Sequence, residues 1–172
     1  FPSVLIGDDY SAALEFLEQV QPKLIVTNNT GIAYEAFQRG INWIAGPHLN
    51  IANSFSLFCL KEDFNCSGAF ISNEISQAQI RQLNKPEGFK LYYSIYHPIA
   101  LMTSRQCLFH QVVGCCKNQI DDTCISQCEK LTTITNLKNE RIYLEKSKGN
   151  YHRIFNNENF LNPDNITDVP DL

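Results

Sequence analysis

The chain has 172 residues, a net charge of −4 at pH 7 and a hydrophobic fraction of 44%. This length and apolar content predict one ordinary folded domain with a buried core. The acidic balance argues against broad electrostatic binding of nucleic acid, although it leaves room for a local basic patch. No apolar run is long enough to cross a bilayer, so we expect no membrane partner.

The cysteine content indicates a cellular compartment. The chain has seven cysteines, an odd number, and two of them are adjacent. A secreted disulfide scaffold usually has an even count and a loop-rich body, and no signal peptide is visible here. We therefore expect a reducing, cytoplasmic compartment.

The first hundred residues alternate between short apolar runs and amphipathic segments. We predict strands at 4–7, 24–27, 41–45, 67–71 and 90–96, separated by helices at 12–20, 30–39, 51–62 and 74–83. The run 24–27 has the apolar character of a parallel strand covered on both faces. The inner face of the helix at 51–62 should consist of Leu49, Ala52, Phe55, Phe58 and Cys59. One helix between successive strands indicates a parallel sheet with right-handed crossovers.

Five such strands cannot close an eight-stranded barrel. The alternatives are an open sheet or the carboxyl-terminal part of a larger barrel, and a start at Phe-Pro rather than Met favours the second. We therefore predict an α/β fold with part of a TIM-like (β/α) barrel, a cysteine-rich segment and a short β-rich region. The predicted boundaries are 1–106 for the barrel part, 107–130 for the cysteine-rich segment, 131–161 for the β-rich region and 162–172 for a frayed or truncated tail.

Five of the seven cysteines lie between Cys107 and Cys128. Four thiolates from one segment can hold a metal ion or an iron–sulfur cluster. The candidate set is Cys107, one of the adjacent pair Cys115 and Cys116, Cys124 and Cys128. Buried free thiols are the alternative interpretation, and we assign that role to Cys59 and Cys66.

Polar residues follow the predicted strands at their carboxyl ends, where α/β sheets bind ligands. Glu74 is a candidate general base, or an acidic residue in the first turn of a helix. His97 is a candidate for orienting a substrate, or a core histidine. Asn50 and Asn53 are helix caps or turn formers on local evidence.

Several segments together resemble peptidase family U32, the collagenase-like proteases. The stretch from Gly46 to Ser54 is similar to the family's G-x-x-x-N-x-x-N-S segment, and Ser72-Asn-Glu74-Ile-Ser76 to its S-x-E-x-S strand end. Further similarities are Tyr96-His97 to an H-G strand end, with Pro98 in place of glycine, Ser104-Arg105-Gln-Cys107-Leu to G-R-C-L, and Cys124-x-x-x-Cys128 to the paired cysteines that follow. The segments 110–115 and 149–153 look most like the branch that contains the large-subunit ribosomal RNA cytidine hydroxylase.

The resemblance implies a 4Fe–4S cluster on four cysteines in a TIM-like barrel. It implies hydroxylation of RNA bases or quinone precursors, in some members with prephenate as the oxygen source. Carried onto this chain, the cluster ligands would be Cys107, Cys115, Cys124 and Cys128. Other branches carry a cysteine just after the His-Gly pair, where this chain has Ile-Ala-Leu-Met, so Cys115 would replace that ligand.

On this interpretation the chain hydroxylates a cytidine of ribosomal RNA, and other domains of a longer protein help to bind the RNA. His97 and Arg105 would contact an anionic donor, because guanidinium binds carboxylates in a fork. Tyr93 or Tyr96 would receive the unstacked base. Four further candidates would line the same substrate site at the carboxyl ends of the strands: His48, Asn50, Asn53 and Glu74.

Two other functions stay open. One is a collagenase-like peptidase, as the family name suggests, although the sequence shows neither a nucleophile–base arrangement nor a His-Glu-x-x-His motif. The other is a zinc-stabilised domain without catalysis, because zinc and a cluster both bind four thiolates.

Overall fold

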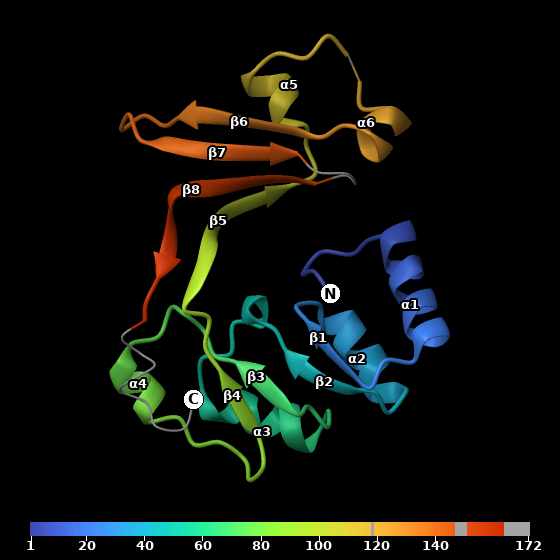
Figure 1. Ribbon diagram of the computed structural model, residues 1–172, viewed down its shortest axis with the longest axis vertical. Coiled ribbons are helices and arrows are strands. Elements are labelled where there is room, and N and C mark those ends of the chain that lie inside the picture. Colours follow the sequence, from blue (N-terminus) through green and yellow to red (C-terminus); the bar gives the residue numbers. More distant parts are fainter. Residues whose placement is uncertain (118, 147–150, 164–172) are drawn as a thin grey trace. The chain divides into compact units, whose positions relative to one another are not determined.

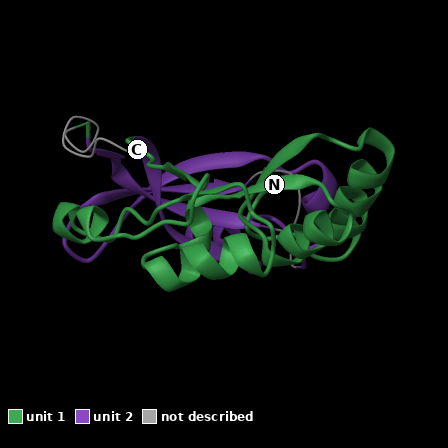
Figure 2. Cartoon of the chain, turned by 90° about the horizontal axis from the view of Figure 1, so that it is seen from below, with its two compact units in different colours: residues 1–95, 163–172 green, residues 96–162 purple. Residues whose placement is uncertain are grey.

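The computed structural model describes residues 1–117, 119–146 and 151–163, and it contains two compact units (Figures 1 and 2). Phe1–Ile95 form unit 1, and Tyr96–Asn162 form unit 2. Unit 1 holds a parallel sheet and unit 2 an antiparallel sheet, so the fold is mixed α/β. The unit boundary lies before residue 106 because Tyr96–Ser104 pairs with a strand of unit 2.

Unit 1 alternates strands and helices along the chain, as the sequence predicts. Its four parallel strands lie in the order β1-β2-β3-β4 (Figure 1). The strands are β1 (Leu24–Thr27), β2 (Asn42–Ala45), β3 (Gly68–Phe70) and β4 (Lys90–Tyr92). The helices are α1 (Asp8–Val20), α2 (Thr30–Gln38), the short 3-10 helix η1 (Pro47–Leu49), α3 (Ser54–Glu62) and α4 (Gln77–Arg81).

The core of unit 1 lies between one face of this sheet and the helices. The strand register places Ile25 beside Trp43, and both belong to the buried cluster. Leu17 of α1, Ile32 of α2 and Leu57 of α3 contribute to the same cluster. The Trp43 indole Nε1 donates a hydrogen bond to a loop carbonyl at 2.9 Å, so its polar atom is satisfied inside the core.

Several sequence-based boundaries in unit 1 were wrong. Residues 4–7 form no strand, and the strand predicted at 90–96 ends at Tyr92. Leu24 and Val26 are 51% and 42% exposed, so β1 is covered on one face rather than two. Helix α4 begins after Ser76, whose capping box with Gln79 stabilises that start better than the predicted start at 74.

The inner face of α3 also differs from the prediction. The helix starts after Asn53, and its buried residue is Leu57. Phe55 is 88% exposed and Cys59 is exposed, so neither belongs to the core, whereas Cys66 is buried as predicted. The apolar residues of this stretch fit two helical phases, and packing against the sheet selected the phase that buries Leu57.

Unit 2 is an antiparallel sheet with two short helices. The strand order is β5-β8-β7-β6. Its elements are β5 (Tyr96–Ser104), α5 (Leu108–Val112), α6 (Asp122–Ser126), β6 (Lys130–Thr135), β7 (Arg141–Lys146) and β8 (His152–Leu161). β6 and β7 pair antiparallel and lie largely within the predicted β-rich region at 131–161. His97-Pro98 was expected to end a strand but lies inside β5, where a register irregularity follows Pro98. Most of the predicted tail at 162–172 lies outside the described residues.

Candidate functional site

Four cysteine side chains line one small cavity in unit 2. They are Cys107, Cys115, Cys124 and Cys128, the same four that the resemblance implies as ligands. The cavity volume is about 20 Å³, and an adjoining cavity of about 200 Å³ is lined by Cys107, Cys115 and Cys124 as well. Residues spread over 22 positions of the sequence therefore converge on one place.

Local structure explains how this convergence arises. Cys107 is the residue before the first turn of α5, and Cys124 lies in α6. Gly114 has φ of +81°, a left-handed conformation that turns the chain after α5 and that glycine adopts without strain. Cys115 follows this turn half-buried against the cavity, whereas Cys116 is exposed and does not line it. The geometry therefore favours Cys115 over Cys116 as a ligand.

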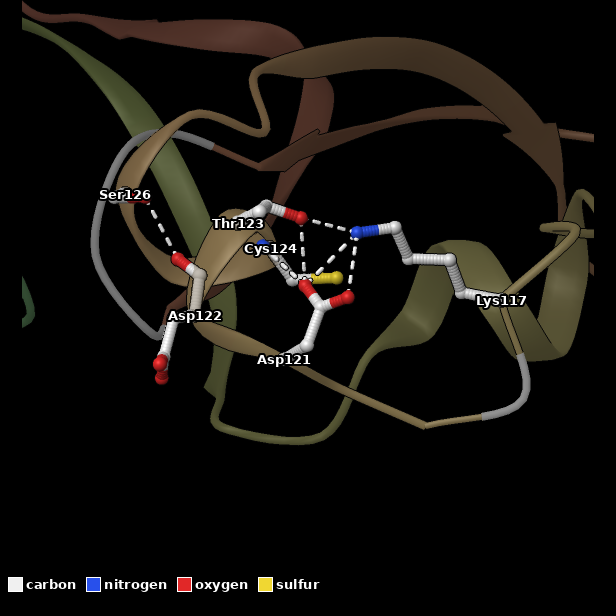
Figure 3. Close-up of polar contacts among 6 residues, drawn as sticks. All are labelled: Lys117, Asp121, Asp122, Thr123, Cys124 and Ser126. Atoms are coloured by element: carbon white, nitrogen blue, oxygen red, sulfur yellow. Dashed lines mark hydrogen bonds and ion pairs between the residues drawn. The ribbon is translucent and has the colours of Figure 1, made fainter.

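Asp121 fixes the start of α6 and with it Cys124 (Figure 3). Its Oδ1 accepts the backbone N–H of Cys124 at 2.9 Å and the Thr123 hydroxyl at 2.7 Å. Lys117 Nζ donates to both carboxylate oxygens at 2.8 Å. The Lys117 ammonium, with help from Thr123 and the Cys124 N–H, holds the pKa of Asp121 well below its usual range. This network therefore stabilises the fold above the unfolded pKa of about 3.9 and stops doing so as pH falls through the lower folded pKa.

The surroundings of Cys115 favour its thiolate form. The backbone N–H of Lys117 lowers the pKa of Cys115, and the charges of Lys130 and Lys117 add smaller effects. The thiolate is the form of cysteine that binds metals. Cys115 is therefore prepared electrostatically for metal binding.

Three basic residues that the sequence analysis did not assign to a site also line the cavity: Lys130, Lys146 and His152. Lys146 and His152 are 4% and 2% exposed. Burial lowers the pKa of His152, and the nearby Lys146 charge lowers it further. Only His152 could have been noticed from the sequence, because it lies in the segment 149–153 that resembles the hydroxylase branch. The structure describes this segment from Tyr151 onward.

The loops at the carboxyl ends of β1, β2, β3 and β4 are hydrogen-bonded to one another. Asn28 Oδ1 accepts the His48 N–H at 2.9 Å, and a Cβ at Gly46 would lie 2.2 Å from that oxygen, so this position requires glycine. Two more links continue the chain of contacts: Ser72 N–H to the Ile51 carbonyl at 2.8 Å, and Asn73 Nδ2 to the Ser94 carbonyl at 2.7 Å.

Four predicted site residues lie in these loops of unit 1. Asn50 has φ of 53° and ends η1, and Asn53 caps α3 by accepting the Ser56 N–H at 2.9 Å. Both therefore have the local structural roles that their residue types indicate. His48 and Glu74 are exposed, and the Glu74 N–H donates to the Ser72 hydroxyl at 3.1 Å.

The other three predicted site residues belong to unit 2. The Tyr96 hydroxyl accepts a hydrogen bond from Asn159 Nδ2 at 2.8 Å. The His97 ring is half-buried and stacks on Phe160 with 4.8 Å between centroids. Arg105 follows β5 and is exposed. The candidate substrate residues are thus divided between the units, whereas the candidate ligands all lie in unit 2.

Residues 7–172 match the model of peptidase family U32. The chain belongs to this family. Neither the curated proteins nor the solved structures include a match. Among the described residues, no helix of this U32 chain is both long and apolar enough to cross a membrane. The match spans both units, so the cysteine-lined cavity and the loops of unit 1 both lie within the U32 region.

Proposed function

We propose that this U32 chain is part of an iron–sulfur-dependent hydroxylase that modifies a cytidine of ribosomal RNA. The observation that carries the proposal is the cavity shared by Cys107, Cys115, Cys124 and Cys128. Four thiolates on one cavity are a typical donor set for a 4Fe–4S cluster. The likeness of 110–115 to the cytidine hydroxylase branch supports the choice of reaction.

The choice of a cluster over zinc rests on the sequence resemblance. Zinc and a 4Fe–4S cluster both bind four thiolates, so the donor set of the cavity fits either group. The segments 104–108 and 124–128 are similar to the G-R-C-L motif and the paired cysteines of the family.

The cluster, when bound, would supply one-electron redox chemistry, and the chain would orient the substrates around it. Arg105 is exposed and carries a guanidinium that can bind the carboxylates of an anionic oxygen donor such as prephenate. His97 is held in place by its stack on Phe160 and is a second candidate for that donor. Tyr96 presents an exposed ring on which an unstacked base can pack.

Unit 1 supports the proposal of a partial TIM-like barrel. Its parallel strands follow one another in sequence order, as in a barrel, rather than reversing as in a doubly wound sheet. The face away from the helices is also apolar, with Val26 on β1 and a stacked Phe70–Tyr92 pair at 5.2 Å. Apolar side chains on that face fit the packed interior of a barrel. His48 and Glu74 would then lie at its ligand-binding end.

Further domains of a longer protein would supply much of the RNA binding, since this chain is acidic. All seven cysteines are free thiols, which fits a reducing, cytoplasmic compartment.

The test is anaerobic purification followed by cysteine-to-serine substitution at all seven positions. Wild-type protein should be brown, with broad visible absorbance from thiolate-to-iron charge transfer, and should hydroxylate ribosomal RNA, measured by mass spectrometry of its nucleosides. Serine at any of the four cavity cysteines should release most of the iron and abolish hydroxylation. Cys116→Ser is the matched control for Cys115→Ser and should keep both.

Two results would contradict the proposed function, and a third would contradict only the assignment of Cys115 as a ligand. Colourless protein with one tightly bound zinc per chain would favour the structural alternative. Cleavage of gelatin that is lost in Glu74→Ala or His97→Ala would favour the peptidase. Loss of iron from Cys116→Ser but not from Cys115→Ser would overturn the ligand assignment and leave the cluster in place.

A further inference from the structure

A row of basic side chains crosses the antiparallel sheet at the cysteine cavity. Lys130 on β6 is directly opposite Lys146 on β7, and Lys146 is directly opposite His152 on β8. Directly opposite residues on antiparallel strands project from the same face. All three line the cavity together with the four cysteines. We call these three residues the basic row.

The basic row is unfavourable for an isolated sheet. Two lysines directly opposite each other repel, and burial of the Lys146 side chain removes water from an ammonium group. His152 is also buried, and its Nδ1 has no hydrogen-bond partner among the described residues. Buried polar atoms are almost always paired, so a water molecule or a group bound in the cavity is the expected partner of this nitrogen.

The four cysteines and the basic row share this cavity. When the thiols are deprotonated, as metal binding requires, they bring negative charge to the same space. The shared lining therefore places opposite charges beside one another.

We propose that the basic row is the counter-charge of the metal–thiolate group held by Cys107, Cys115, Cys124 and Cys128, an inference that rests on the proposed function. Four thiolates outweigh the positive charge of an oxidised cluster core, so the bound group is a net anion. Lys130 and Lys146 balance this charge, and His152 Nδ1–H donates a hydrogen bond to a sulfur atom. The row thereby raises the reduction potential, because it stabilises the more negative, reduced state most.

The experiment compares three lysine-to-methionine variants of the full chain. Lys146→Met and Lys130→Met remove one charge each from the row and keep an unbranched side chain of similar length. Lys138→Met is the matched control, since Lys138 lies in the turn between β6 and β7 and does not line the cavity. Each protein is loaded anaerobically with iron and sulfide, and its iron content, visible spectrum and dye-mediated reduction equilibrium are measured.

Both row variants should retain the visible spectrum of the cluster. Their reduction equilibrium should shift toward the oxidised state by about tenfold, which corresponds to about 59 mV for a one-electron couple. Lys138→Met should match the wild type. The proposal is overturned if Lys130→Met and Lys146→Met both titrate like Lys138→Met. Because Lys130 is exposed, its variant keeps the test valid even where Lys146→Met does not fold.

A second arm separates this inference from the proposed function. Wild-type protein that takes up no iron would refute the hydroxylase, and the row is then tested with Cd²⁺ alone, whose thiolate complexes absorb in the ultraviolet. Because four thiolates also outweigh the charge of Cd²⁺, Lys130→Met and Lys146→Met should weaken Cd²⁺ binding about tenfold relative to Lys138→Met. Equal Cd²⁺ affinities in the three variants, or no Cd²⁺ binding by the wild type, would overturn the proposal that the basic row is the counter-charge of a metal–thiolate group.

Discussion

Unit 1 and unit 2 bury different kinds of side chain. The buried hydrophobic cluster of the chain lies entirely in unit 1, around Trp43, Leu57 and Ile32. In the described part of unit 2 the buried side chains are Phe109, Leu144, Lys146 and His152, of which two are ionisable.

This difference indicates two sources of stability. Unit 1 can fold by burial of apolar surface alone. A segment as small as Tyr96–Asn162, with so few buried apolar residues, usually requires a disulfide, a metal or a partner. All of its cysteines are free, and the metal group of the proposed function would hold unit 2 together.

Removal of iron should have the largest effect and should be confined to unit 2. We expect anaerobic chelation to raise amide hydrogen exchange throughout β5–β8 and to leave β1–β4 protected. Hydrogen-exchange mass spectrometry measures both units in one sample. Equal protection of unit 2 with and without iron would contradict the division between the units.

Truncation of a buried leucine should test the complementary expectation, that unit 1 depends on its apolar core. Leu57→Ala should lower the free energy of unfolding of unit 1 by about 2–5 kcal/mol, since it leaves a cavity in a packed core. Phe55→Ala, two residues away on the exposed face, should change it by less than about 0.5 kcal/mol. Chemical denaturation followed by Trp43 fluorescence measures both. Similar losses of unfolding free energy in the two variants would mean that α3 does not bury Leu57 and expose Phe55 as described.

Loss of the Asn53 cap should have a smaller effect, again in unit 1. Asn53→Ala removes the acceptor for the Ser56 N–H and should lower the free energy of unfolding by about 1 kcal/mol. Asn53→Asp keeps a side-chain acceptor and should therefore retain most of the wild-type free energy of unfolding. If Asn53 instead binds substrate, both variants should lose activity while the unfolding curve stays unchanged.

The smallest effect should come from Asp121 in unit 2. Asp121→Asn keeps a side-chain acceptor for the Cys124 N–H and weakens the ion pair with Lys117, whereas Asp121→Ala removes both. In the metal-free protein we expect faster amide exchange across α6 in the alanine variant and a smaller change in the asparagine variant. An equal increase in both would show that the charge, rather than the cap, positions Cys124.

The sequence alone determined the order of strands and helices in unit 1 and the grouping of four cysteines. Both depend on signals that are local in the chain: apolar periodicity, capping residues and close spacing of one residue type. The β-rich region at 131–161 was also predicted, and it contains most of β6 and all of β7 and β8.

Tertiary structure decided the features that depend on partners distant in sequence. Pairing with β8 placed Tyr96 and His97 in an antiparallel strand, although their local pattern suggested the end of a parallel one. Packing against the sheet chose the phase of α3 and left Val26 exposed on β1. The basic row emerged in the same way, because Lys130, Lys146 and His152 become neighbours through the register of three strands. The hydrophobic pattern and the turns constrain register, but only the assembled sheet shows which residues lie opposite one another.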